Sequence, residues 1–363
     1  MPESPETEDE HCFQPPWETD GDADLESPFP AHARQSVEPD YHHPLLEPLA
    51  RAQEALTCLE TRAETASAAV AEGLLARLSY REAAGWLGYA HVWIHPHDLA
   101  LRDRSLTGSY GAAFRAGRLG RQIPATTARE GEFEAAPSDI FIDQALRLAR
   151  LWQRLAELRT WRPLADAAAI QETLQSLGCR GALAEPEIAD WLALTEGFSG
   201  PRLIRCGRAV RDWMSRSTIE PCNPDGVFLA ACLWRDKHAR PIPLPFWSAP
   251  EARHYRRDLH VGLEWLADFL ACVEAAALVG LDELARLQRA EATTRSLGRT
   301  ARSRLPQAAD AALRAPILTA RDLAKSLGIT TQAALGLLRQ LSEAGILQEA
   351  TGRSSWRAFT LAN

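Results

Sequence analysis

The sequence predicts an all-α protein that ends in a short β-hairpin, and three observations support this fold class. Apolar residues recur three and four residues apart from Leu45 to Leu287, which is the period of helices with one buried face. No segment before the last twenty residues shows the strict alternation of a half-buried strand. The 363 residues are 46% hydrophobic and 24% charged, which gives enough apolar surface for two folded units.

Residues 1–44 are predicted to be a disordered tail. They combine eight prolines with a dense run of acidic residues, so they have too little apolar surface to offset the entropy of folding. Residues 1–40 alone hold twelve acids and one base. The tail therefore carries more negative charge than the whole chain, whose net charge is −8.

Residues 45–300 are predicted to form a helical bundle. One long helix is expected over about 45–70, because the apolar residues from Leu49 to Val70 share one face. Ser79 and Glu82 have the spacing of a capping box, which predicts the start of the next helix.

The remaining helices of the bundle follow the same period. They are expected at about 138–160, 166–177, 187–195, 202–216 and 226–237. A longer helix runs from Leu263 past Leu287, and Gly280 marks the point where it can bend. Four tryptophans on the apolar faces are expected in the core: Trp86, Trp152, Trp191 and Trp265.

Residues 301–363 are predicted to be a separate domain. Thr319 can cap a short helix that ends at Gly328, and a second helix begins at Thr330 or Thr331 and ends at Gly345. A turn at residues 351–353 joins two strand-like segments, 346–349 and 356–361, into a hairpin. Two helices joined by a Gly-containing turn and followed by a hairpin are typical of a winged helix-turn-helix.

This pattern predicts double-stranded DNA as a partner. Residues 292–363 hold ten bases and four acids, and neutralising phosphates supplies most non-specific affinity for DNA. The second helix can enter the major groove, where Gln332 can read adenine and Arg339 can contact guanine or a phosphate. The expected DNA-binding residues on that helix and at the wing tip are Thr330, Thr331, Gln332, Arg339, Gln340, Arg353, Ser354 and Ser355. Since the helix face offers only one formal charge, we expect a homodimer with two half-sites.

The C-terminal segment Leu318–Leu361 resembles the winged helix found after the catalytic domain in many bacterial Fic proteins. Upstream, Pro243–Ser248 followed by Trp265 resembles the stretch after the Fic active-site helix. The resemblance implies a Fic-like helical body. Fic enzymes transfer AMP to protein hydroxyls with a motif of the form H-P-F-x-(D/E)-G-N-G-R. The corresponding residues here, Glu220–Gly226, contain no His to act as a base and no paired glycines to hold phosphate, so we expect no enzyme and no cofactor.

A second resemblance concerns the block Asp98–Asp103. It is similar to an Asp-Leu-(Val/Ala)-Leu-His-Asp block in an uncharacterised bacterial family that joins a degenerate Fic-like domain to a C-terminal helix-turn-helix, although Arg102 replaces the usual His. The resemblance implies a DNA-binding transcriptional regulator whose body serves partner or self-association. Two alternatives stay open, a module whose winged helix binds protein and a residual nucleotidyltransferase that transfers AMP.

Other features exclude further classes of protein. His91, His95 and His97 are spaced like metal ligands, but Pro96 interrupts them and no fourth partner is evident, so we expect turn and helix-end roles and no metal site. Seven scattered cysteines without a C-x-x-C pair fit a reducing cytoplasm. No window of 18 apolar residues predicts a membrane span, and the first forty residues do not resemble a secretory signal.

Overall fold

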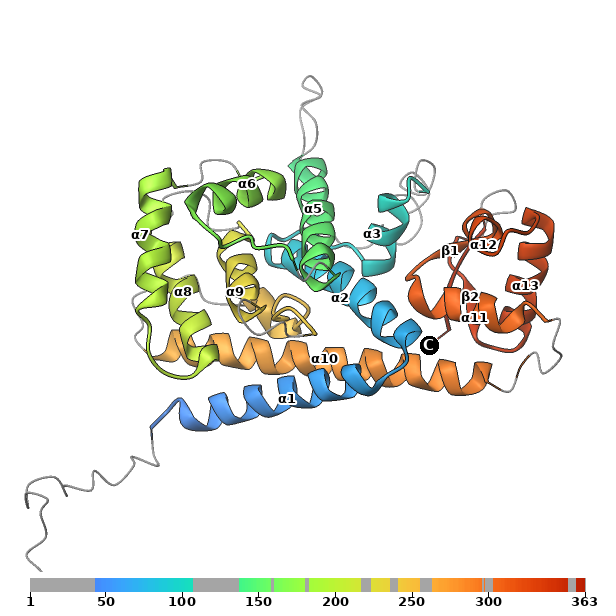
Figure 1. The fold of residues 1–363 in the computed structure, drawn as a ribbon, viewed down its shortest axis with the longest axis horizontal. Helices are drawn as coiled ribbons and strands as arrows, with labels where there is room; N and C mark the ends of the chain where they lie inside the picture. The colour runs from blue at the N-terminus through green and yellow to red at the C-terminus, as the bar shows by residue number, and fades with distance from the viewer. Residues whose placement is uncertain are drawn as a thin grey trace, which may run out of the picture. The chain divides into compact units, whose positions relative to one another are not determined.

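The predicted fold class is confirmed by a computed structural model of the chain, shown in Figure 1. It describes residues 43–106, 137–157, 160–179, 183–216, 223–235, 241–254, 263–295, 297, 303–351 and 357–362. The chain divides into two units, residues 1–43 and 44–363, and every element below belongs to the second. The predicted disordered tail, residues 1–44, lies outside the described residues except for its last two.

The single helix expected over 45–70 is wrong, because the chain forms two helices there. Helix α1 spans Leu46–Thr65 and helix α2 spans Ala68–Tyr89. Between them Ala66 is extended, and the Ser67 side chain accepts a hydrogen bond from the backbone N–H of Val70 at 3.3 Å. A serine at the N-cap position satisfies a helix N–H that would otherwise lack a partner, so Ser67 ends one helix and opens the next.

The capping box predicted at Ser79 and Glu82 is also wrong, since both residues lie inside α2. Ser79 donates back to the carbonyl of Ala76 at 2.8 Å. The buried Glu82 carboxylate instead accepts backbone N–H groups from segment 246–248, at 2.9 to 3.1 Å. Burial raises the pKa of Glu82, and these hydrogen bonds partly offset the rise. Glu82 therefore anchors a distant loop on α2.

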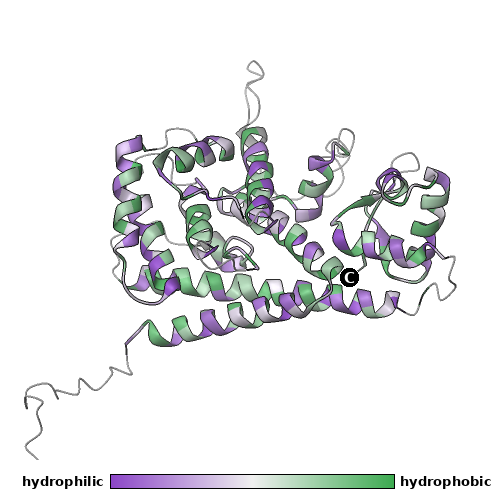
Figure 2. Ribbon diagram, viewed as in Figure 1, coloured by the Kyte–Doolittle hydropathy of each residue, from purple (hydrophilic) through white to green (hydrophobic). Residues whose placement is uncertain are grey.

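Helix α10, Glu264–Thr294, is the long helix that the sequence predicts, and it runs without interruption through Gly280. It lies alongside α1, and α2 packs on it as well (Figure 1). A Cβ atom at Gly280 would come within 2.8 Å of the Leu59 side chain, so the glycine allows α1 to approach closely. Figure 2 shows that the first part of α10 is mainly apolar and its last turns mainly polar.

The other predicted helices of the body are present within three residues of their expected ends. They are α5 (Pro137–Glu157), α6 (Ala167–Leu177), α7 (Glu185–Glu196), α8 (Arg202–Arg216) and α9 (Asp225–Arg235). Helix α3 (Pro96–Asp103) and the 3-10 helix η1 (Pro250–His254) complete the body. The four tryptophans expected in the core are at most 2% exposed, which confirms that prediction.

The C-terminal part contains three helices and a small sheet. The helices are α11 (Leu305–Arg314), α12 (Ala320–Leu327) and α13 (Thr331–Glu343). The strands are β1 (Leu318–Thr319), β2 (Leu347–Glu349) and β3 (Ala358–Leu361), in the antiparallel order β1-β3-β2. Strands β2 and β3 confirm the predicted hairpin, and the structure places Leu347 opposite Leu361. The sequence did not predict strand β1, which pairs with β3. None of the helices described in the structure is both long and apolar enough to cross a lipid bilayer.

Candidate nucleic-acid interface

Helices α12 and α13 are joined as the sequence predicts. The Thr319 hydroxyl caps α12 by accepting the N–H of Asp322 at 3.1 Å, and Gly328 ends it in the left-handed conformation at φ 64°. Thr330 caps α13 by accepting the N–H of Ala333 at 3.2 Å. Each of these interactions is local in sequence, so the turn that fixes the angle between the two helices is encoded by adjacent residues.

Helix α13 has one buried and one exposed face. Ala334, Leu338 and Leu341 are fully buried and pack it on α11, α12 and β2. The opposite face is exposed to solvent and includes Gln332, Arg339 and Gln340, while Thr330 and Thr331 are exposed at the helix start; these five are the predicted DNA-binding residues that the structure describes. Their spacing places the two glutamines and Arg339 on one side of the helix. That they contact DNA stays a prediction.

The wing is described at its base. Strands β2 and β3 pair through Glu349 and Phe359, and the Thr351 hydroxyl accepts the N–H of Ala358 at 3.1 Å. Arg357 lies 3.9 Å from the Glu349 carboxylate and is one-third exposed. The three predicted wing-tip residues, Arg353, Ser354 and Ser355, lie outside the described residues.

Two exposed cations on α12, the helix before α13, are not among the residues predicted from the sequence. Arg321 and Lys325 lie on α12 with exposed side chains. They are four residues apart and so share a face of that helix, a spacing that was visible in the sequence. Asp322 between them is paired with Arg104 of the body at 2.8 Å, which lowers the negative charge that α12 would present to a polyanion.

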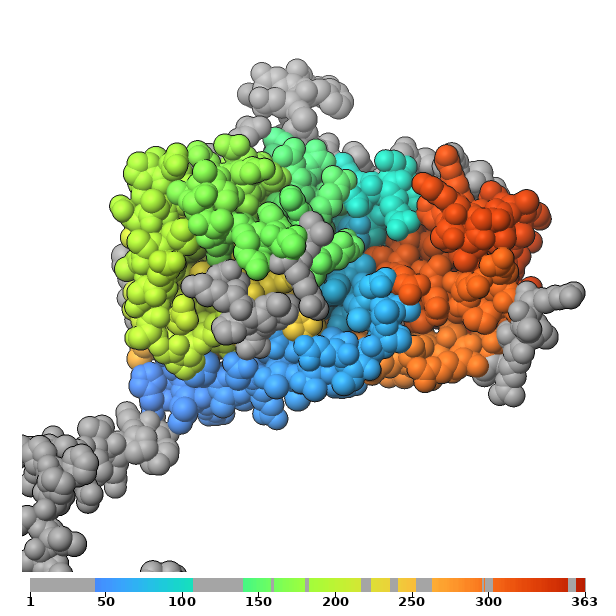
Figure 3. Space-filling view, in the orientation of Figure 1, coloured from blue at the N-terminus to red at the C-terminus, as the bar shows by residue number. Residues whose placement is uncertain are grey.

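The C-terminal helices attach to the body through α11. Arg77 of α2 donates to the carbonyls of Ala312, Leu313 and Ala315 at 3.1, 2.6 and 2.8 Å, and so caps the end of α11. A Cβ atom at Gly73 would fall 2.1 Å from the Leu313 carbonyl oxygen, so α11 and α2 touch backbone to backbone. In Figure 3 the orange and red atoms of this part adjoin those of α2 and α3.

The end of strand β3 also contacts the body. Arg286 of α10 donates to the carbonyls of Leu361 and Ala362 at 3.3 and 3.5 Å. The attachment therefore uses α11, the end of β3 and the pair of Asp322 with Arg104, and no contact described between the two parts uses the exposed face of α13. This arrangement allows α13 to approach a partner while the domain stays fixed on the body.

The positions expected to correspond to the Fic motif are described only in part. Residues 217–222 lie outside the described residues. Asp225 is buried in the first turn of α9, where its carboxylate accepts the N–H of Gly226 at 2.8 Å, and burial raises its pKa.

The histidines weighed as metal ligands lie at a helix start. His95 is the N-cap of α3, where its Nδ1 accepts the N–H of His97 at 3.2 Å. His91 has a positive φ of 61° in the preceding turn. In the described part of the chain, no three His, Cys, Asp or Glu side chains are grouped so that they can hold a metal ion.

Comparison with known families identifies the C-terminal part of the chain. Residues 305–361 match a family model described as an HTH DNA binding domain. This range begins at α11 and ends at β3, so it contains the capped turn and the exposed face of α13. A comparison of the chain with curated proteins found no match.

Proposed function

We propose that this protein is a transcriptional regulator that binds double-stranded DNA with α13 and the β2–β3 wing. The observation that carries the proposal is the exposed face of α13 in a segment that matches an HTH DNA binding domain. The attachment of that segment to the body through α11 and the end of β3 leaves this face open.

The side chains on this face suit a division between base and phosphate contacts. Gln332 can make two hydrogen bonds to adenine, and Arg339 can do so to guanine in the major groove. The hydroxyls of Thr330 and Thr331 at the helix start can bind phosphate oxygens. Arg321 and Lys325 on α12 add two cations, which supply affinity without sequence information.

The active form is proposed to be a homodimer. The exposed face of α13 carries one cation, Arg339, and also the anion Glu343, so a single copy makes few strong contacts with DNA. Two copies on two half-sites add their contacts and set the half-site spacing. Size-exclusion chromatography with light scattering tests this directly, because a monomer at high protein concentration contradicts the proposal.

The helical body is proposed to be a Fic-like scaffold without nucleotidyl transfer, used for partner or self-association in the cytoplasm. The support is the sequence Glu220–Gly226, which lacks the base and the phosphate-binding glycines, together with the burial of Asp225. Calorimetry with ATP and Mg²⁺ tests this proposal. Binding within the body would favour the alternative of a residual transferase.

The proposed DNA binding is tested by selecting bound fragments from a genomic library with the full chain. We expect recovery of a shared two-fold symmetric sequence. Gln332→Ala should relax the preference at one position by about 1–3 kcal/mol. Arg51→Ala, a change of an exposed arginine on α1, is the control and should leave the selected sequence unchanged.

The alternative function, a module whose winged helix binds protein, predicts a different result. In that case no fragment is enriched, and Arg339→Ala leaves the protein's function intact. The observation that keeps this alternative in view is that Arg339 is the one cation on the exposed face of α13 and that Glu343 offsets it.

A further inference from the structure

A cavity of about 250 Å³ lies where the body meets the C-terminal helices and sheet. Its wall combines residues of α2 and α10 with His97 at the start of α3 and with Gln348 of strand β2. A volume of this size is smaller than the cavities that take drug-sized ligands, so it suits a small molecule.

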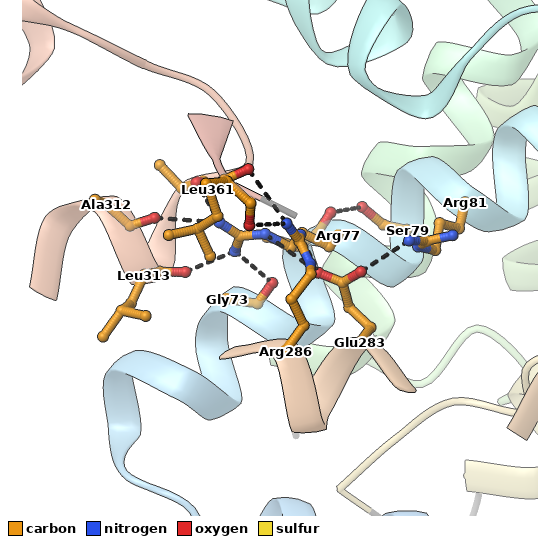
Figure 4. Close-up of polar contacts among 12 residues, drawn as sticks. Gly73, Arg77, Ser79, Arg81, Glu283, Arg286, Ala312, Leu313 and Leu361 are labelled. Carbon is orange, nitrogen blue, oxygen red and sulfur yellow. Dashed lines mark hydrogen bonds and ion pairs between the residues drawn. The ribbon is translucent and has the colours of Figure 1, made fainter. Parts of the chain in front are cut away.

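Three arginines of this wall surround a single carboxylate (Figure 4). The Glu283 carboxylate oxygens lie 3.5 Å from Nε of Arg77, 2.8 Å from a terminal guanidinium nitrogen of Arg81 and 2.6 Å from a terminal guanidinium nitrogen of Arg286. The group therefore carries two positive charges in excess. The side chains of Arg77 and Glu283 are 3% and 1% exposed, and that of Arg286 is 15% exposed.

Excess positive charge at such depth is costly, because neighbouring water cannot solvate it. The pKa of Arg77 is lowered to about 9, chiefly by burial; Glu283 opposes this fall, and Arg286 and Arg81 contribute to it. The carbonyls that accept from Arg77 belong to neutral peptide groups. An anion in the cavity would compensate the charge that Glu283 leaves unbalanced.

Two hydrogen-bond donors of this cluster are also unused. The Nε–H groups of Arg77 and Arg286 are buried and have no hydrogen-bond partner among the described residues, although Nε of Arg77 lies 3.5 Å from the Glu283 carboxylate. Arg81 is 39% exposed and contacts Glu283 through one of its terminal nitrogens, so its guanidinium can also reach solvent. Guanidinium groups bind carboxylate and phosphate oxygens with strong, directed hydrogen bonds.

We propose that this cavity is a binding site for a small metabolite bearing a carboxylate or phosphate group, and that its occupant strengthens the attachment of the C-terminal helices to the body. Gln348 lines the same cavity as the arginines, so one ligand contacts both parts. Arg286 additionally holds the end of β3 through Leu361. The inference does not rest on DNA binding, and its test is independent of it.

The test is isothermal titration of the full chain at constant ionic strength with three probes. Inorganic phosphate represents phosphate esters, succinate represents carboxylates, and succinamide is the uncharged control. We expect one site per chain for phosphate or succinate, none for succinamide, and a higher thermal midpoint with the bound probe. Which of the two anions binds identifies the ligand chemistry.

Two arginine variants make the test specific. Arg81→Gln removes a cation of the cavity at a partly exposed position and should weaken anion binding at least about tenfold. Arg314→Gln is the matched control, because Arg314 pairs with Glu72 at 2.9 Å on the exposed surface and does not line the cavity. It should bind the anion like the wild-type chain.

Two results would overturn the proposal. The first is the absence of binding by both anions at about 10 mM, well above the concentrations at which enzymes and binding proteins meet most metabolites. The second is equal weakening by Arg81→Gln and Arg314→Gln, which would mean that the anion responds to overall charge and not to this cavity. Hydrogen exchange at Leu313 and Leu361 reports the attachment, and unchanged exchange in the bound state would contradict the second half of the proposal.

Discussion

At the scale of single residues, Glu283 is the carboxylate that pairs with all three arginines of the cavity wall. It is 1% exposed and pairs with Arg77, Arg81 and Arg286. Removing one partner of a buried ion pair leaves an uncompensated charge, which costs far more than the pair itself contributes. Sequence reasoning did not find this cluster, because its members are separated by about two hundred residues and only the fold brings them together.

Glu283→Gln should lower the free energy of unfolding by about 3–5 kcal/mol, since three cations then lose the carboxylate with which they pair. Urea denaturation of the full chain measures this. Glu274→Gln, in the same helix, is the control: Glu274 pairs with Arg51 near the surface and should cost less than about 1 kcal/mol. Equal losses for the two variants would show that the cluster has no special role in stability.

His97 should make the stability of the chain depend on pH. Its pKa is lowered from the ordinary 6.5 to about 4, chiefly by burial; the charges of His95 and Arg286 contribute to this fall, and Glu283 opposes it. Between these values the unfolded chain binds a proton that the folded chain does not, so the free energy of unfolding falls as pH decreases from 6.5 towards 4. The wild-type chain should lose more stability between pH 7 and pH 5 than His97→Gln does. Parallel pH profiles would contradict the assignment.

At the scale of elements, the sequence predicts correctly those helix ends and turns that are fixed by interactions between neighbouring residues. The turn between α12 and α13 is predicted correctly because Thr319, Gly328 and Thr330 act on residues no more than four positions away. The single helix over 45–70 is predicted wrongly. The apolar spacing continues across Ser67 and so gives no sign that this residue is the N-cap of a new helix. Glu82 is misread for a related reason: its partners lie more than 160 residues away.

The contact between α2 and α11 gives a test at this scale. Gly73→Ala should lower the free energy of unfolding by about 1–3 kcal/mol, because the new methyl group would meet the Leu313 backbone at 2.1 Å. Gly336→Ala is the matched control in α13, where no atom lies within 4 Å of an added Cβ. Gly336→Ala should raise the free energy of unfolding by up to about 1 kcal/mol, because alanine has a higher helix propensity than glycine. Thermal unfolding of both variants measures these changes, and destabilisation of the same size in both would contradict this packing.

At the scale of the whole molecule, charge is distributed unevenly along the chain. Residues 1–40 hold twelve acids and one base, whereas residues 292–363 hold ten bases and four acids. The net charge of −8 therefore hides a basic C-terminal part. The sequence predicts this division and the helix-turn-helix. It could not predict which face of that domain is left open, because this depends on how α11 and β3 meet α2 and α10.

The central claim, that α13 binds DNA, is tested most directly by the salt dependence of binding to a labelled duplex. Fluorescence anisotropy of the full chain between about 50 and 200 mM salt should show affinity falling steeply as phosphate contacts are lost. Arg339→Ala should weaken binding by about 1–3 kcal/mol and, if the arginine contacts phosphate, reduce the salt slope by about one per chain. Arg51→Ala should change neither. An absence of binding by the wild-type chain even at the lowest salt would contradict the account.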